Sequence, residues 1–293
     1  MLKNLSAPEF RIKLPDGRIL SGATLGPRGG KPLFLFHGFP GSRYQRPLDV
    51  ALLEELNVRL ISLERPGIGR STFMPNRALK DWPVDVSRVA DEFGYEHFSV
   101  IGNSAGGPYA LSCAALLPQR VLACVTVGSL APLSLMLKLK PYNRAGTFFR
   151  FVRRYPIIAR VLLSGGRQFL RRTTFFPTPD FIKRQSIADQ ELLRERWFAK
   201  HLLGDFRESF YPGVKGHIHD AHVLSSPWGF SLGEIRVPVH LFHSPEDKVV
   251  PYVFSEAMAK AIPNAVLHTV TESGHYHLPI RKLRSILECL AQD

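Results

Sequence analysis

Residues 98–110 constrain the fold of this chain more than any other segment. Residues 98–101 are short, mostly apolar and rich in β-branched side chains, which is typical of a buried strand. A glycine-rich corner follows, and residues 109–117 then form an apolar run of good helix formers that ends before a proline. The segment therefore predicts a strand that turns sharply into a helix.

The corner contains the sequence Gly-Asn-Ser-Ala-Gly, with Ser104 at its centre. A serine at such a tight turn has strained backbone angles, and a Cβ at Gly102 or Gly106 would collide with the neighbouring strand or helix. The first turn of the helix also directs backbone N–H groups toward whatever the serine oxygen attacks. Taken alone, the motif also fits a β–α turn that carries no chemistry.

The composition is that of an ordinary globular protein with an excess of basic residues. The 293 residues suit one large α/β domain or a core with an insertion. No run of about 18 apolar residues is present, and the first residues lack the apolar run of a signal peptide, so we expect a cytoplasmic protein. Cys113, Cys124 and Cys289 are odd in number and lie in apolar helix or strand contexts, which indicates buried free thiols in a reducing compartment rather than a zinc site.

Strands and helices alternate over most of the chain, and one segment interrupts them. We expect a doubly wound core in residues 1–132 and 218–293, with a helical insertion at residues 133–217. The expected strands are residues 9–14, 18–25, 33–36, 58–63, 98–101, 121–127, 237–242 and 265–270. The expected helices of the core are residues 43–57, 81–93, 109–117, 252–261 and 278–291.

A carboxylate and an imidazole each follow a late strand. Asp247 and Glu246 come shortly after residues 237–242, and His275 comes shortly after residues 265–270. An open parallel sheet places its site at the carboxyl ends of its strands, so these groups are expected near Ser104. A serine needs a base to take its proton and a carboxylate to orient that base.

Three motifs together resemble the α/β-hydrolase superfamily over essentially the whole chain, and most closely its cap-bearing esterase and peptidase members. They are His-Gly-x-Pro-Gly-Ser at residues 37–42, Arg-Pro-Gly-x-Gly-x-Ser at 65–71, and the serine corner with the Gly-Pro-Tyr-Ala that follows it. The order Ser104, Asp247, His275 is that of the superfamily. The resemblance implies a mostly parallel sheet with helices on both faces and an inserted helical cap.

The same resemblance implies roles for individual residues. Ser104 is the expected nucleophile, His275 the general base and Asp247 the orienting carboxylate, with Glu246 as its only close rival. The backbone N–H groups of Phe39 and Ala105 are the expected oxyanion donors.

Two positions depart from the family pattern. Glu64 stands where the family usually has aspartate, and we expect it to make a structural contact at its loop. Ser244 replaces the usual glycine, which allows the Asp247 loop to be aimed differently.

These residues predict acyl transfer without a metal or cofactor. The expected substrate is a lipophilic carboxylic ester. Attack of Ser104 on its carbonyl carbon requires neutral His275, which predicts a rate that rises through an apparent pKa near 6 to 7. An amide or peptide substrate is the alternative, and the fold also hosts lyases and ligand receptors. His37 is expected to pack in its loop, His277 to face solvent, and His217 with His219 not to bind a metal.

The positive charge of the chain belongs to the insertion. Residues 133–217 contain 17 Lys and Arg against 6 Asp and Glu, whereas the chain has a net charge of +13. Two stretches, residues 148–155 and 169–176, interleave aromatic residues with arginine, including Arg150, Arg153, Arg154, Arg171 and Arg172. Such stretches fit aromatics packed on the core beneath a solvated basic face. They also fit a cap that docks on an anionic membrane surface, so that the protein is peripheral to the membrane. No recognised nucleic-acid-binding module accompanies the charge, so nucleic acid is not an expected partner.

Overall fold

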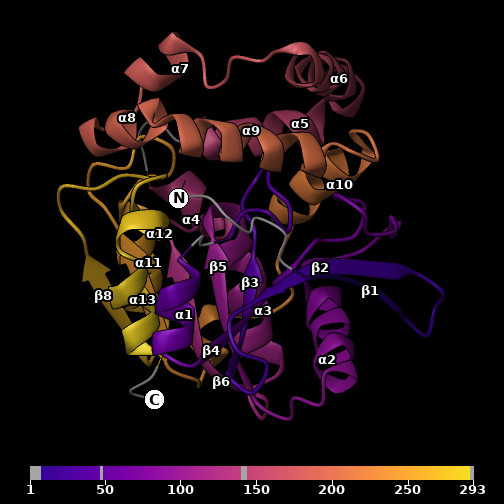
Figure 1. The fold of residues 1–293 in the computed structure, drawn as a ribbon, viewed down its shortest axis with the longest axis vertical. Coiled ribbons are helices and arrows are strands. Elements are labelled where there is room, and N and C mark those ends of the chain that lie inside the picture. Colours follow the sequence, from indigo (N-terminus) through magenta and orange to yellow (C-terminus); the bar gives the residue numbers. More distant parts are fainter. Residues whose placement is uncertain (1–7, 47–48, 140–143, 291–293) are drawn as a thin grey trace.

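The computed structural model describes residues 8–46, 49–139 and 144–290 (Figure 1). Its centre is an eight-stranded sheet in the order β1-β2-β4-β3-β5-β6-β7-β8. The strands are β1 (Glu9–Lys13), β2 (Ile19–Leu25), β3 (Lys31–Phe36), β4 (Val58–Leu63), β5 (Phe98–Asn103), β6 (Val121–Val127), β7 (Val239–His243) and β8 (Ala265–Thr269). Neighbours from β4 to β8 are parallel, whereas β2 is antiparallel to both β1 and β4. All eight predicted strands are therefore present.

The sheet is buried on both faces because its central strands are apolar throughout. In β3, Phe34 and Phe36 belong to the cluster packed against α2 (Trp82–Glu92), α3 (Gly107–Leu116) and α11 (Val253–Ala261). Leu33 and Leu35 alternate with them and pack on the other face. That second face is covered by α1 (Val50–Glu55), α12 (Leu278–Arg281) and α13 (Leu283–Cys289).

In the described part of the chain, seven α-helices lie between β6 and β7, and those from α5 to α9 form a layer beyond the sheet, whereas α4 and α10 contribute buried residues to the core beneath it. Figure 1 shows α8, α9 and α5 above the carboxyl ends of the strands, with α6 and α7 outermost. The helices are α4 (Leu133–Lys138), α5 (Arg144–Arg154), α6 (Pro156–Arg172), α7 (Pro179–Lys183), α8 (Ile187–Arg194), α9 (Arg196–Ser209) and α10 (Lys215–Leu224). Residue 217, where we expected the insertion to end, lies inside α10.

Two predicted helices differ from those observed. The helix expected at residues 43–57 is shorter than predicted, because, of its described residues, only those of α1 are helical. Arg43 lies instead in a buried loop, where it binds Glu64 at 2.6 Å and Glu208 at 2.8 Å. Residues 47–48 of that prediction lie outside the described residues. The helix expected at residues 278–291 is divided into α12 and α13, because the backbone at Lys282 leaves the helical region (φ −110°, ψ 17°). Residue 291 of that prediction lies outside the described residues.

Two of the three cysteines are buried in the core. Cys113 and Cys124 are buried free thiols, as predicted, and Cys289 is half-buried. Within residues 8–46, 49–139 and 144–290, no helix combines the length and the apolar character that a membrane span requires.

Candidate active site

Ser104 lies at the predicted corner between β5 and α3. It begins a one-turn 3₁₀ helix, Ser104–Gly106, and its φ of +53° falls in the left-handed region that a serine rarely adopts. A Cβ on Gly102 would collide with the Gly106 carbonyl group, and one on Gly106 would collide with that of Phe36. The predicted need for glycine at both positions is thus confirmed. Ser104 thus follows directly on the carboxyl end of β5, where it is half-buried.

Asp247 and His275 are paired beside this corner. The Asp247 Oδ2 atom lies 2.7 Å from the His275 Nδ1 atom, and its Oδ1 atom accepts hydrogen bonds from the backbone N–H groups of Val249 (2.7 Å) and Val250 (2.8 Å). Burial would raise the pKa of Asp247, but the charge of His275 lowers that pKa well below its usual range. The carboxylate is therefore ionised, and it accepts a hydrogen bond from the protonated Nδ1 atom of His275.

The same pairing sets the basicity of His275. Burial lowers the pKa of the imidazole, but the nearby Asp247 carboxylate raises it more, so the pKa lies above the ordinary value of 6.5. With Nδ1 held by Asp247, Nε2 is the ring atom left to receive a proton. This tautomer is the one that a general base requires.

The loop after β3 lies against Ser104. A Cβ on Gly38 would come within 3.2 Å of the Ser104 Cβ atom, so the two backbones are in close contact. Among the described residues, none accepts a hydrogen bond from the Phe39 N–H group. Ala105 is the second residue of the 3₁₀ helix, where N–H groups have no intrahelical partner. The expected donor Ala105 thus follows Ser104 directly, and the expected donor Phe39 follows the glycine that contacts Ser104.

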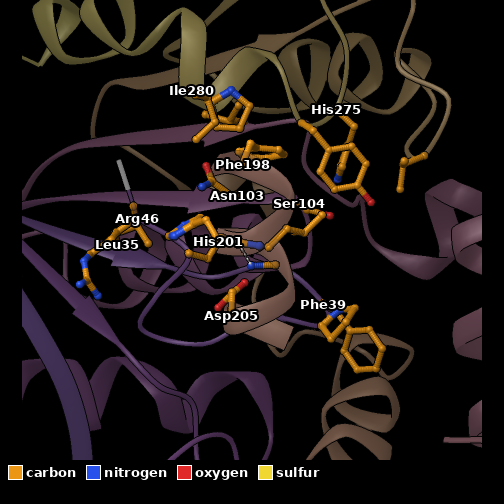
Figure 2. A pocket seen from close by; sticks show the side chains of 18 of the residues that line it. Leu35, Phe39, Arg46, Asn103, Ser104, Phe198, His201, Asp205, His275 and Ile280 are labelled. Carbon is orange, nitrogen blue, oxygen red and sulfur yellow. Dashed lines mark hydrogen bonds between the residues drawn. The ribbon is translucent and has the colours of Figure 1, made fainter. Parts of the chain in front are cut away.

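Ser104 and His275 line the same cavity, which has a volume of about 100 Å³ (Figure 2). Its wall is mostly apolar and comes from β3, β5, α9, α12 and α13, including Leu35, Ile101, Phe198, Leu202, Ile280 and Leu283. Three polar side chains, Arg46, His201 and Asp205, lie at one part of the wall, and Figure 2 shows His201 and Asp205 next to each other. Burial raises the pKa of Asp205 to about 7 and lowers that of His201 to about 4.

A family model described as the alpha/beta hydrolase fold matches residues 31–279. The chain belongs to the alpha/beta hydrolase family. The match spans the serine corner, the Asp247 loop and the His275 loop, so all three groups described above lie within it.

Named relatives of this alpha/beta hydrolase include an esterase. The chain is 24% identical over 261 residues to a bifunctional esterase/perhydrolase of Acinetobacter calcoaceticus, which covers 87% of this chain and 89% of that protein. It is 33% identical over 123 residues to a serine hydrolase-like protein of Danio rerio, an alignment that covers 41% of this chain and 37% of that protein. The esterase RhEst1 of Rhodococcus sp. ECU1013 has a similar fold, with a TM-score of 0.69 at 20% identity over 99% of both chains.

A buried carboxylate from the insertion holds the loop that carries His275. Asp189, on α8, accepts hydrogen bonds from the backbone N–H groups of His275 (2.8 Å), Tyr276 (2.9 Å) and His277 (2.8 Å). Asp189 is fully buried. Sequence reasoning missed this residue, because its partners are 86 to 88 positions away and no local motif marks it.

A second buried network holds the loop that carries Phe39. Asp220, on α10, binds Arg65 at 2.8 Å and Arg77 at 2.6 Å. Arg65 also donates hydrogen bonds to the carbonyl oxygens of His37 and, at 3.0 Å, Gly38. The arginine of the second family motif therefore fixes the backbone next to the expected oxyanion donor, and its buried carboxylate partner was missed.

Gly128 contacts the Asp247–His275 pair from the end of β6. Its φ is +55°, and a Cβ there would lie 3.2 Å from both the Asp247 Oδ2 atom and the His275 Nδ1 atom. A side chain would therefore be strained and would push on the paired atoms. Sequence reasoning missed this glycine, because none of the motifs includes it.

Three further residues make structural contacts. They are Glu246, the alternative candidate for the carboxylate, and the two residues that depart from the family pattern, Ser244 and Glu64. Glu246 accepts a hydrogen bond from the Ser273 N–H group at 2.9 Å, and Ser244 donates one to the Ser273 carbonyl oxygen at 3.1 Å. Both residues thus join the Asp247 loop to the His275 loop. Glu64 binds Arg43 and accepts a hydrogen bond from the Arg70 N–H group at 2.7 Å, so the expected structural contact is present. Burial raises the pKa of Glu64 to about 7.

The other histidines occupy separate positions. His37 is fully buried in its loop, as predicted, with its Nδ1 atom 2.9 Å from the Gly38 carbonyl oxygen. The His217 ring stacks on Phe210 with a centroid distance of 3.9 Å. His277, which the sequence predicts to face solvent, is half-buried instead, with its Nδ1 atom 3.0 Å from the Ser273 Oγ atom.

Proposed function

We propose that this alpha/beta hydrolase is a serine esterase that cleaves carboxylic esters through an acyl-enzyme on Ser104. The observation that carries the proposal is the Asp247–His275 pair, 2.7 Å apart, beside a cavity that Ser104 and His275 both line. The name of the Acinetobacter calcoaceticus relative supports an ester as the substrate.

The acylation step uses the tautomer that Asp247 fixes. His275 Nε2 takes the proton of the Ser104 hydroxyl while Oγ attacks the ester carbonyl carbon. The negative charge that develops on the carbonyl oxygen is bound by the N–H groups of Phe39 and Ala105, each contributing about 10²–10³ in rate. Asp247 stabilises the imidazolium that forms. His275 then gives its proton to the leaving alcohol, and the acyl group remains on Ser104.

Deacylation repeats the same steps with water. His275 Nε2 takes a proton from water, whose oxygen attacks the acyl carbon, and the carboxylic acid leaves as Ser104 regains its proton. Neither acylation nor deacylation uses a metal or cofactor in this proposal. The loops that Asp189 and Arg65 hold keep the base and the oxyanion donors in position throughout.

The cavity favours a small acyl group. A cavity of about 150 Å³ holds a benzene molecule, and the cavity here is about 100 Å³ with mostly apolar walls. A short aliphatic acyl chain fits such a volume, and the alcohol part extends from it.

Hydrolysis of p-nitrophenyl esters of increasing chain length tests this function. We expect the highest kcat/KM for acetate to butyrate and a decline of at least about tenfold for the octanoate, since added methylenes exceed the cavity. The matched p-nitroanilides serve as the amide comparison. Faster cleavage of the anilides would make the protein an amidase, and no cleavage of either series would contradict a hydrolytic function.

The pH dependence of kcat/KM reports the state of His275. Attack requires the neutral imidazole, so the rate should rise with pH through the pKa of His275 and then level off. Because Asp247 raises that pKa, the midpoint should lie above 6.5. Asp247→Asn removes the charge that raises it, so the midpoint of its residual rate should move to lower pH. A rate independent of pH between about 5 and 9 would contradict a histidine base.

A further inference from the structure

The outermost helix of the insertion exposes a row of large apolar side chains. On α6, the exposed fractions are 81% for Ile157, 51% for Ile158, 68% for Val161, 60% for Leu162 and 49% for Phe169. Single exposed apolar residues are common on protein surfaces, whereas a group of five on one helix is typical of an interaction site. We call this set the α6 surface.

Helical spacing places these residues on one face. Ile157, Val161 and Phe169 follow one another at intervals of four or eight, and Ile158 and Leu162 form the adjacent row. Gly165 and Gly166 continue the two rows, with open space where a Cβ would lie. The opposite side of α6 packs inward through the buried residues Ala159 and Leu170. The exposed residues are therefore additional to those that stabilise the insertion.

The charge around this face has one sign. Residues 133–179 contain ten Lys and Arg and no Asp or Glu. Besides Arg153, five exposed cations lie on α5 and α6, namely Arg150, Arg154, Arg160, Arg171 and Arg172. None of these five forms an ion pair with any residue in the described part of the chain. Arg153 and Arg167, by contrast, donate hydrogen bonds to the backbone carbonyl oxygens of Ser225 and Phe210.

We propose that the α6 surface docks on an anionic membrane. Apolar side chains on one face of a helix, flanked by arginines, are the pattern of a helix that lies in the membrane interface. The apolar residues enter the headgroup boundary, and the arginines bind the anionic lipids beside them. A second copy of the chain is a poorer occupant, because it would bring an equally basic surface against this one. Figure 1 places α6 on the outer side of the insertion, away from the sheet.

Docking does not depend on the chemistry proposed for Ser104. A membrane-bound enzyme would hydrolyse esters near the bilayer, whereas a catalytically inactive protein would bind it equally well. Binding and activity are therefore measured separately, and Ser104→Ala should bind vesicles like the unaltered protein.

Co-sedimentation with vesicles of phosphatidylcholine, with and without 30% phosphatidylglycerol, tests the proposal. We expect binding only to the anionic vesicles and a steep loss of binding between about 0.05 and 0.5 M salt. The quadruple variant Arg154→Gln, Arg160→Gln, Arg171→Gln, Arg172→Gln should bind about 10²–10³-fold more weakly, since each basic residue strengthens binding about fivefold. The double variant Ile157→Ser, Val161→Ser should also weaken vesicle binding, but the salt dependence of that binding should stay unchanged because no charge is removed.

A matched control removes the same charge elsewhere. Arg11, Lys13, Arg28 and Arg88 are exposed on the sheet domain, and replacing all four with Gln lowers the net charge equally. This control should lose less than about tenfold in vesicle binding. An equal loss in the control, equal binding to neutral vesicles, no binding to either, or a dimer that buries the α6 surface would overturn the proposal.

Discussion

Replacing Ser104 with alanine should lower kcat for ester hydrolysis by at least about 10⁴-fold, because the nucleophile, base and carboxylate act as one unit. His275→Ala should cost a similar factor, since no other group can take the serine proton. Asp247→Asn should cost somewhat less, because the amide keeps part of the geometry but no longer fixes the tautomer. Each variant should unfold cooperatively at nearly the temperature of the unaltered protein.

The neighbouring carboxylate provides the control for this series. Glu246 lies one residue before Asp247 and binds the Ser273 N–H group rather than His275. Glu246→Gln keeps an acceptor for that hydrogen bond, so its kcat should stay within about tenfold of the unaltered protein. If Glu246→Gln is as damaging as Asp247→Asn, the carboxylate of the site has been assigned wrongly.

Asp220→Ala should lower the free energy of unfolding by about 3–5 kcal/mol, the cost of removing one partner from a buried ion pair. The change leaves the guanidinium groups of Arg65 and Arg77 buried, with 1% and 3% of their side chains exposed, and without the carboxylate between them. Arg65 also holds the carbonyl groups of His37 and Gly38, so the loop that carries Phe39 should lose its position as well.

Urea unfolding of Asp220→Ala measures this effect, with Asp16→Ala as the matched control. Asp16 binds Arg18 with half of its side chain exposed, and an exposed pair contributes about 0–1 kcal/mol. Equal unfolding midpoints for the two variants would contradict the account of the buried network. A stable Asp220→Ala protein with unchanged kcat/KM would show that Arg65 does not position the oxyanion loop.

The local parts of the fold could be predicted because local sequence determines them. The strand, corner and helix around Ser104 follow one another within a few residues, and the steric demand at Gly102 and Gly106 can be stated without knowing the rest of the fold. The same holds for β1 and β2, whose hairpin is specified by a Pro-Asp-Gly turn.

The helix expected at residues 43–57 is shorter than predicted, with only α1 helical among the described residues, for a reason that local sequence does not contain. Ser42 donates hydrogen bonds to Asp205 from both its backbone (2.8 Å) and its hydroxyl group (2.6 Å), and Arg43 binds Glu64 and Glu208. These partners lie up to 165 residues away, and they hold the segment as a loop against its helical propensity.

The carboxylates that support the site could not be predicted for the same reason. Asp189 and Asp220 lie in helices of the insertion, and each meets its partners across 86 to 155 residues of sequence. An isolated aspartate in a helix gives no signal until the packing of the insertion on the sheet is known. The candidate reacting groups are recognisable in the sequence because motifs surround them, whereas the residues that hold their loops have none.

Labelling with a fluorophosphonate, followed by peptide mass spectrometry, tests the central claim most directly. The reagent forms a covalent bond only with a serine that an adjacent base activates. We predict one phosphonyl group per chain, located on Ser104, with no labelling of Ser104→Ala and greatly slowed labelling of His275→Ala. Label on a different residue, or equal labelling of Ser104→Ala, would contradict the claim that Ser104 is the activated nucleophile of this hydrolase.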